Sequence, residues 1–268
     1  MDPVFQYVTF LLTGIVAGVV SGAFGVGGGS IMTPVQFWLY TGSGMDSTIA
    51  TRLAFGTSLA VIIPTMISGA LGHHRRGAVD WKAAIPMGCA AVFGGFAGGL
   101  FASQIPGSTL RLFFAGFILI MAVRMVWQLR ECPACEPRGS TAGFLLIGLF
   151  IGILSGLTGL GGGALLVPIM IILLGYPIHR AVGTSSACLI FSAAGALAAY
   201  VITGTGVAGL PQYAIGYVDI VTFALFAVTT IPLARVGVRF AHSCSGRNLH
   251  ILFAALLVLI GISMLVRG

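Results

Sequence analysis

The chain has 268 residues and a net charge of +7, with 13 basic and 6 acidic side chains, so only 7% of it is charged. An ordinary soluble domain carries roughly 25% charged residues, and 7% cannot cover the surface of a folded chain of this length. Hydrophobic residues make up 57%, which excludes a disordered chain, and the 40 glycines lack the three-residue period of collagen. The composition indicates a polytopic membrane protein.

Long stretches of the chain contain no charge at all. Residues 3–45, 139–179 and 181–218 hold no Asp, Glu, Lys or Arg. About 20 apolar residues form one membrane-spanning helix, so each stretch holds one or two spans. The stretches are apolar on all sides, whereas barrel strands alternate, which predicts an all-α protein. The basic residues stand singly or in pairs between spans, which indicates orientation in a lipid bilayer and no nucleic-acid partner.

Ten apolar segments are expected, five in each half of the chain. In chain order they are 4–21, 30–41, 48–71, 81–103, 109–129, 141–155, 164–175, 180–202, 212–240 and 247–266. The second segment of each half has only about 12 residues, too few to cross a bilayer at 1.5 Å per residue.

The two halves are copies of one pattern. Ser21–Gly29 matches Ser155–Gly163 at an offset of 134 residues, and Gly56–Ser58 matches Gly183–Ser185 at an offset of 127. A shared order of motifs with loops of different length is typical of a duplicated domain. The predicted organisation is a first transmembrane repeat at 1–130, a polar loop at 131–140 and a second repeat at 141–268.

Basic residues are distributed oppositely in the two repeats. Loops 72–82 and 235–247 carry Lys and Arg, whereas their repeat equivalents, 203–217 and 96–108, carry none. Because basic loops stay on the cytoplasmic side, this bias predicts two inverted repeats with both termini outside the cytoplasm. The absence of a basic residue before the first apolar run argues against a cleaved signal peptide. The expected location is the bacterial inner membrane.

The glycine runs Gly25–Gly29 and Gly159–Gly163 predict broken membrane helices. Each glycine costs about 1 kcal/mol relative to Ala inside a helix, and unwound backbone at membrane depth must face protein or a water-filled cavity. A short helix then begins near Ser30 and near Ala164, and its first N–H groups and positive dipole end favour an anion. Two such ends at an inverted-repeat interface predict an anion site near the midplane.

The alternative is that these glycines only permit close packing, as we expect for the rows Gly14/Gly18/Gly22 and Gly148/Gly152/Gly156.

Other polar positions leave more than one interpretation open. The hydroxyls of the two Thr-Ser pairs, Thr57-Ser58 and Thr184-Ser185, either line a substrate path or hydrogen-bond to the backbone of their own helix. Thr33 and Gln36 are weaker candidates for the path. Arg52 and Arg180 either guide an anion or mark the membrane boundary. We expect Asp80 and Asp219 to cap helices.

The five cysteines and the missing motifs bear on other classes of function. Cys132-Pro133-Ala134-Cys135 is a reduced loop pair, a redox pair, or part of a Cys3His zinc site with His242 and Cys244. No metalloprotease HExxH or nucleophile-elbow GxSxG motif occurs, and the glycine runs lack the βαβ context of a dinucleotide site. We expect neither an enzyme nor a cofactor or resident metal.

Ser155–Pro168, with its weaker copy Ser21–Pro34 and the segment Val182–Ser185, resembles the signature of the TauE/SafE family of sulfite and organosulfonate exporters. The resemblance covers nearly the whole chain. It implies transport of small sulfur-containing anions and implies that the glycine loops and the Thr-Ser pairs bind them. With Ser30 and the two arginines, the candidate substrate-binding residues are Gly25, Gly27, Gly28, Gly29, Ser30, Thr57, Ser58, Gly159, Gly161, Gly162, Gly163, Thr184, Ser185, Arg52 and Arg180.

The leading hypothesis is a secondary transporter, an exporter of sulfite, sulfoacetate or other organosulfonates that works by alternating access. The alternatives are a channel-like anion pathway, and a membrane sulfur-handling protein that uses Cys132 and Cys135. The sequence leaves the substrate, the transport direction, the coupling ion and the oligomeric state open.

Overall fold

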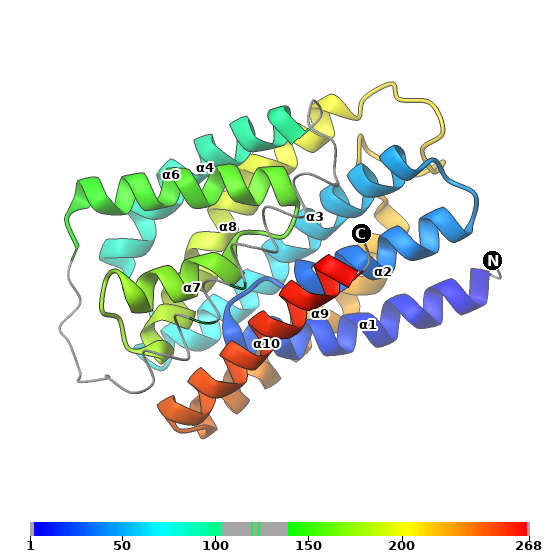
Figure 1. Ribbon diagram of the computed structural model, residues 1–268. Coiled ribbons are helices and arrows are strands. Elements are labelled where there is room, and N and C mark those ends of the chain that lie inside the picture. Colours follow the sequence, from blue (N-terminus) through cyan, green and yellow to red (C-terminus); the bar gives the residue numbers. More distant parts are fainter. Residues whose placement is uncertain (1–2, 103–118, 120–122, 124–138, 267–268) are drawn as a thin grey trace.

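The computed structural model describes residues 3–102, 119, 123 and 139–266, and these residues form a bundle of helices (Figure 1). The helices are α1 (Pro3–Phe24), α2 (Gly29–Gly42), α3 (Ser47–His74), α4 (Trp81–Ala102), α6 (Thr141–Thr158), α7 (Gly163–Ile172), α8 (Ile178–Thr203), α9 (Ile220–Ser243) and α10 (Gly246–Val266). The described residues contain no β-strand, only an isolated bridge between Ala214 and Asp219. The all-helical fold predicted from the sequence is confirmed.

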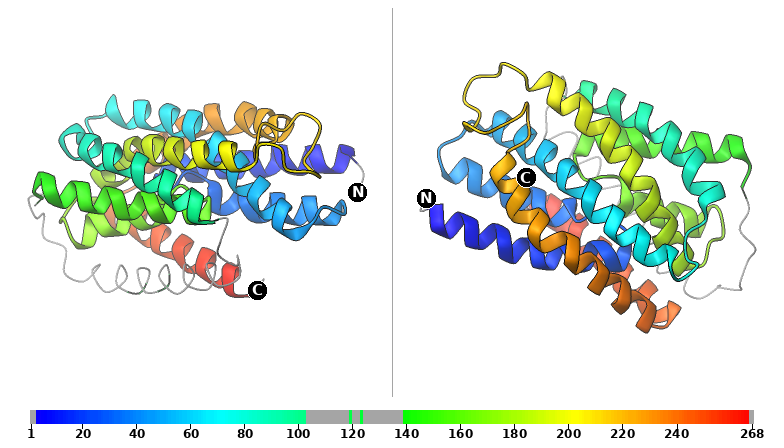
Figure 2. Two further views of the ribbon diagram at one scale, coloured as in Figure 1. Left: turned by 90° about the horizontal axis from the view of Figure 1, so that it is seen from above. Right: turned by 180° about the vertical axis from the view of Figure 1, so that it is seen from behind.

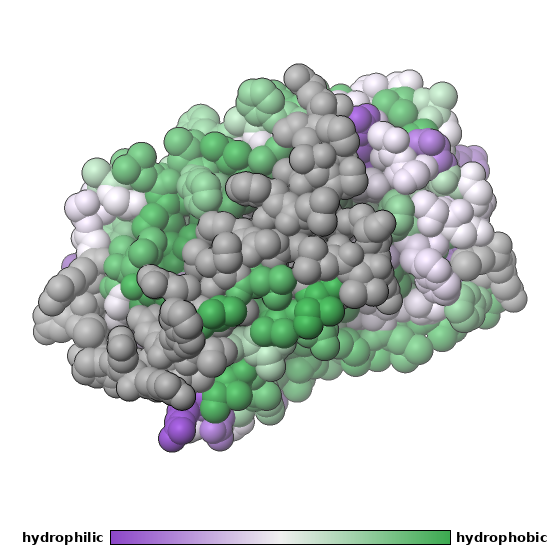
Figure 3. Space-filling model, in the orientation of Figure 1, coloured by the Kyte–Doolittle hydropathy of each residue, from purple (hydrophilic) through white to green (hydrophobic). Residues whose placement is uncertain are grey.

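Six of these helices, α1, α3, α4, α6, α8 and α9, are long and apolar enough to cross a membrane. Their outward faces carry large apolar side chains: Phe93 is 74% exposed and Val228 is 71% exposed. Figure 3 shows hydrophobic residues over the flank of the bundle and hydrophilic residues gathered toward its ends. A lipid bilayer accounts for apolar exposure on this scale, which water would penalise.

Helix α3 is the centre of the bundle and packs against both α8 and α9 (Figures 1 and 2). On either side, α1 packs along α9 and α4 packs along α6. Each outer pair therefore combines one helix from each half of the sequence. The two halves are interlocked and bury their common core between them.

The glycine rows create the close crossings of the outer pairs, as predicted. A Cβ at Gly18 of α1 would lie 2.8 Å from Thr230 Cα of α9, and one at Gly152 of α6 would lie 2.8 Å from Ala91 Cα of α4. In both crossings the backbones touch because there is no side chain between them.

Equivalent helices start at opposite ends of the bundle. In Figure 1, α1 and α3 begin at the right-hand end, whereas α6 and α8 begin at the left-hand end. The left-hand end gathers the end of α3, the start of α4 and the end of α9, with Arg75, Arg76, Lys82 and Arg239 in or beside these termini.

Segment boundaries differ from the expectation in one place by more than a few residues. The segment expected at 212–240 is wrong at its start, because α9 begins at Ile220. Residues 204–219 form a connection in which Gly206, Gly209 and Gly216 have positive φ, and Asp219 caps the helix by accepting from the N–H of Val221. Most of the segment expected at 109–129 lies outside the described residues.

Candidate functional site

Two broken helices meet at the centre of the bundle. Between α1 and α2, Gly25, Gly27 and Gly28 have φ of 64°, 84° and 71°. Between α6 and α7, the equivalent glycines Gly159, Gly161 and Gly162 have φ of 64°, 80° and 74°. Residues with a Cβ rarely adopt these conformations, so both chain reversals require glycine. The predicted helix breaks are confirmed, and the two loops, 25–28 and 159–162, have the same backbone shape.

The short helices α2 and α7 begin directly at these loops. Their N-cap residues are Gly28 and Gly162, and no described side chain caps either helix start. The first N–H groups and the positive ends of both helix dipoles therefore lie among buried residues. Such helix starts are suited to an anion.

The two loops touch each other across the middle of the molecule. A Cβ at Gly163 would lie 2.5 Å from the Gly25 oxygen, and one at Gly29 would lie 3.1 Å from Leu160 Cα. Two equivalent apolar side chains, Ile62 of α3 and Leu189 of α8, pack against both loops, so that a Cβ at Gly27 would meet Leu189 at 3.0 Å. The loops are thus closed off in this conformation.

Buried hydroxyls without a described hydrogen-bond partner lie near the two loops. The hydroxyls of Ser21, Ser30 and Ser155 are buried and have no hydrogen-bond partner among the described residues. Ser30 is the second residue of α2, and Ser155 lies beside the start of α7, where a Cβ at Gly162 would be 3.5 Å from the Ser155 Cβ. An unpaired buried hydroxyl costs about 1–3 kcal/mol, so these positions indicate a place for a polar partner.

The Thr-Ser pairs have two different kinds of contact. Ser185 of α8 donates to the Gly25 oxygen in the first loop at 3.0 Å, while Ser58 of α3 bonds to Thr33 at 2.9 Å and to Gln36 at 2.8 Å. Gln36 Oε1 is buried and unpaired. The serines therefore lie next to the loops or the short helix. Thr33, Gln36 and Ser58 form a buried polar cluster at α2.

The threonines of these pairs connect the two halves. Thr57 Oγ1 accepts from the Asp219 N–H at 2.9 Å, and Thr184 Oγ1 accepts from the Asp80 N–H at 3.0 Å. Because Thr57 and Asp80 belong to the first half and the other two to the second, both bonds cross between halves. We call them the threonine ties.

Each tie is extended by a tyrosine. Tyr40 donates to Asp219 Oδ2 at 3.1 Å, and Tyr176 donates to Asp80 Oδ2 at 2.9 Å. Burial, with the Asp80 hydrogen bond and charge, raises the pKa of Tyr176, so its phenol stays protonated and donates. Asp80 and Asp219 cap α4 and α9, as predicted, through the N–H groups of Lys82 and Val221.

The two candidate arginines lie away from the loops. Arg180 pairs with Asp80 at 3.3 Å, and Arg52 donates to the Tyr217 hydroxyl at 3.2 Å. Arg52 precedes Ile62 by ten residues, or about 15 Å along the helix. The structure therefore groups the glycines and serines but places both arginines at the bundle ends.

Two further groups of residues are a pair of histidines and the cysteines of the polar loop. No local pattern predicted a contact between His73 and His242, whose rings form a hydrogen bond of 3.0 Å between Nδ1 of His73 and Nε2 of His242. Cys132 and Cys135 lie outside the described residues, and the described residues hold no cluster of His, Cys, Asp and Glu that suits a metal ion.

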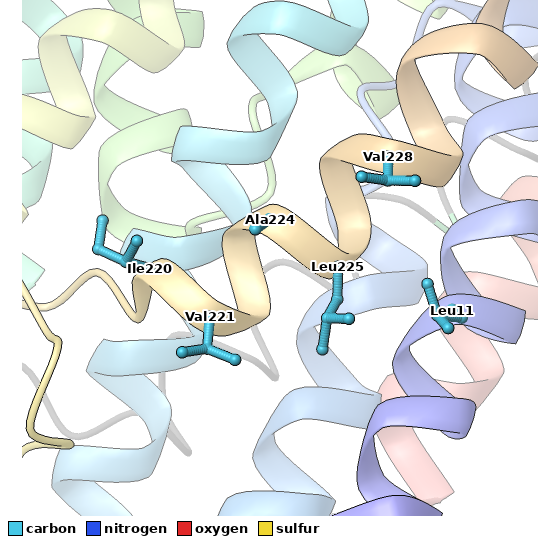
Figure 4. A pocket seen from close by; sticks show the side chains of 6 residues that line it. All are labelled: Leu11, Ile220, Val221, Ala224, Leu225 and Val228. Carbon is cyan, nitrogen blue, oxygen red and sulfur yellow. The ribbon is translucent and has the colours of Figure 1, made fainter.

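A surface recess of about 420 Å³ lies between α1 and α9, lined by Leu11, Ile220, Val221, Ala224, Leu225 and Val228 (Figure 4). Its lining is entirely apolar and faces the flank of the bundle. It is suited to a lipid chain and not to an anion.

Similar proteins cover nearly the whole chain. Three relatives are each described as a probable membrane transporter protein. MJ0441 of Methanocaldococcus jannaschii is 29% identical over 256 residues, covering 95% of this chain and 94% of the relative. The Haemophilus influenzae relative is 26% identical over 257 residues, with 96% and 97% covered, and YunE of Bacillus subtilis is 25% identical over 286 residues, with 98% of each covered.

No solved structure matches the chain. The family model described as "Sulfite exporter TauE/SafE" matches residues 10–264. The repeated glycine motifs lie within this match, and the chain therefore belongs to the TauE/SafE family of membrane transporters.

Proposed function

We propose that the protein is a secondary transporter that exports small sulfur-containing anions, such as sulfite, sulfoacetate or other organosulfonates, across the bacterial inner membrane. The substrate binds between the starts of α2 and α7, at loops 25–28 and 159–162. The two repeats are inverted, and the basic left-hand end of Figure 1 faces the cytoplasm, which leaves both termini outside.

The observation that carries the proposal is the meeting of two uncapped helix starts with unpaired hydroxyls in a buried core. Neutral donors suffice for a small oxyanion, because N–H groups and hydroxyls supply hydrogen bonds without adding a fixed charge. A site without a fixed countercharge also releases its substrate readily.

The closure of the loops favours alternating access over a channel. Ile62 and Leu189 pack against both loops, and the residues of the loops are buried. A channel needs a continuous water-filled path, whereas an alternating-access transporter passes through closed conformations.

Thermal unfolding of the purified protein with a panel of anions tests the proposal. The panel holds sulfite, thiosulfate, sulfate, sulfoacetate, isethionate, taurine and chloride. An anion at 100 times its dissociation constant stabilises the protein by about 2.7 kcal/mol. We expect selective stabilisation by a sulfur anion, and saturable flux of that anion in proteoliposomes. Equal effects of all anions, or none, would contradict the proposal.

Ser30→Ala identifies the site in the same experiment. The Ser30 hydroxyl has no described partner, so removing it leaves the stability of the free protein unchanged or higher. We expect about tenfold weaker anion binding. Thr203→Ala is the control, because its hydroxyl bonds to the Ala199 oxygen in its own helix, 14 residues beyond Leu189, and should not affect binding.

A further inference from the structure

A pair of histidines links helices of both halves at the basic end of the bundle. His73, near the end of α3, is 1% exposed, and its Nδ1 lies 3.0 Å from Nε2 of His242, near the end of α9. The other nitrogen of His73, Nε2, lies 2.9 Å from the Gly22 oxygen of α1. Helix α8 also packs against His73, because a Cβ at Gly183 would lie 3.1 Å from the His73 Cβ.

These contacts define which nitrogens carry hydrogen. The Gly22 carbonyl can only accept, so Nε2 of His73 is the donor. In the neutral ring Nδ1 is then an acceptor, and Nε2 of His242 donates to it. His242 is partly exposed, so the pair runs from the surface to a buried ring.

The second half of the chain makes the same backbone contact without a histidine. Tyr200 is the repeat equivalent of His73 at the offset of 127, and its hydroxyl donates to the oxygen of Gly156, the equivalent of Gly22, at 2.9 Å. A tyrosine therefore suffices to hold this carbonyl. A histidine ring, unlike a tyrosine, can also bind a second proton and become a cation.

We infer that His73, reached through His242, is a proton-binding site and that proton binding there is coupled to anion transport. This inference rests on the proposed transport function. A proton from the surface binds to Nδ1 of His242, and the proton on Nε2 of His242 moves to Nδ1 of His73. His242 ends neutral and His73 ends as an imidazolium, with no other bond made or broken.

The charge created in this way lies where it can act on the glycine loops. The charged and titratable groups that face the pair are Arg76, after α3, and His179, near the start of α8, and α1 contributes none. The ring centroid of His179 lies 5.3 Å from that of His242, with the rings tilted, and Nε2 of His179 donates to the Ala241 oxygen. An imidazolium among these groups disfavours the packing of α3 against α9 unless an anion or a conformational change compensates for the added charge. His73 bonds to Gly22, which is only three residues before Gly25, the first glycine of the first loop.

Proteoliposomes that contain a pH-sensitive dye test the coupling, with isethionate as the probe. Isethionate is the anion of a strong acid and carries no proton itself. For the wild type we expect an isethionate gradient to change the internal pH, and an imposed pH gradient to drive isethionate. His73→Gln should reduce this net coupled movement at least tenfold, while isethionate exchange at equal pH stays within about twofold of the wild type.

Two more variants separate titration from structure. His242→Gln interrupts the relay without removing the Gly22 bond and should slow net movement in the same way. His74→Gln is the matched control, because the adjacent His74 bonds at the surface to Trp81 and should behave as wild type.

The outcomes separate a failure of proton coupling from a failure of anion transport. If wild-type protein moves isethionate but the internal pH does not change, or if His73→Gln still couples the two, the inference is wrong while the transport function stands. An equal loss of exchange and net movement in both relay variants would assign the pair a structural role only and overturn the inference. If the wild type moves no isethionate at all, transport of this sulfonate and the coupling both fail.

Discussion

Gly27 and Gly161 show most directly how single residues determine the shape of the site. Both have φ near 80° and both lie against the side chains of Ile62 and Leu189. Glycine has two effects at these positions. It permits the left-handed turn, and it leaves the backbone N–H groups of the loop accessible to an anion at close range.

Alanine at either position tests this role. In Gly27→Ala or Gly161→Ala, the left-handed conformation costs about 1–2 kcal/mol and the new methyl lies about 3.0 Å from an apolar side chain. We expect at least tenfold weaker anion binding, measured by ligand-dependent thermal unfolding. Gly44→Ala is the control: Gly44 has φ of 88° but no neighbour within 4 Å, so it carries the same strain and should bind normally. Equal binding by all three variants would exclude the loops as the site.

At the scale of the helices, the outer pairs decide how tightly the two halves interlock. Gly152 of α6 lies against Ala91 and Gly95 of α4, and Gly18 of α1 lies against Thr230 of α9. Lipid surrounds helices as favourably as other helices do, so this association depends on close packing of backbones.

Two alanine substitutions should therefore have opposite effects on stability. Alanine favours a helix over glycine by about 1 kcal/mol, and Gly69→Ala should gain up to this amount because only the flexible Met66 lies nearby, at 3.6 Å. Gly152→Ala should lose about 1–3 kcal/mol through overpacking against α4. Unfolding in detergent measures both. A stabilised Gly152→Ala would show that α4 and α6 do not pack as closely as described.

At the scale of the whole molecule, the sequence predicted what depends on local composition and missed what depends on contacts between distant residues. Charge-free stretches located the spans, and glycine-rich runs located both helix breaks. The bond between His73 and His242 joins residues 169 positions apart, and no local pattern signals it. The equivalence of His73 and Tyr200 was hidden because the same contact is made by different residue types.

The buried polar cluster at α2 was also missed as a cluster, because the sequence marked Thr33 and Gln36 only as weaker candidates. Thr33 and Gln36 lie on a short apolar helix, where either residue usually bonds to its own backbone or packs in the core. Their contacts with Ser58 of α3 become visible only when the two helices are placed side by side. The predicted start of α9 was too early because hydrophobic residues in 212–219 resemble the helix in composition, whereas Asp219 caps the helix start and the helix begins only at Ile220.

The threonine ties connect the two halves on opposite sides of the glycine loops. Thr57 precedes Ile62 by five residues and Thr184 precedes Leu189 by five. Since α3 and α8 begin at opposite ends of the bundle, the two ties lie toward opposite ends (Figure 1). Alternating access requires that these two ends open in turn.

Valine at each tie should consequently shift the molecule in opposite directions. Thr57→Val leaves the buried Asp219 N–H without its acceptor, and Thr184→Val does the same to the part-buried Asp80 N–H. Each loss should cost up to about 1–3 kcal/mol in the conformation where the bond is made. A change of 1.4 kcal/mol alters the ratio of conformations tenfold, so each variant should bind the anion better from the side that it opens. Binding from each side, measured in vesicles of defined orientation, reveals the shift. The double variant should return to the wild-type ratio, and Thr203→Val, which loses only a bond within its own helix, should not change it. A shift of both single variants toward the same side would rule out opposite gates at the two ties.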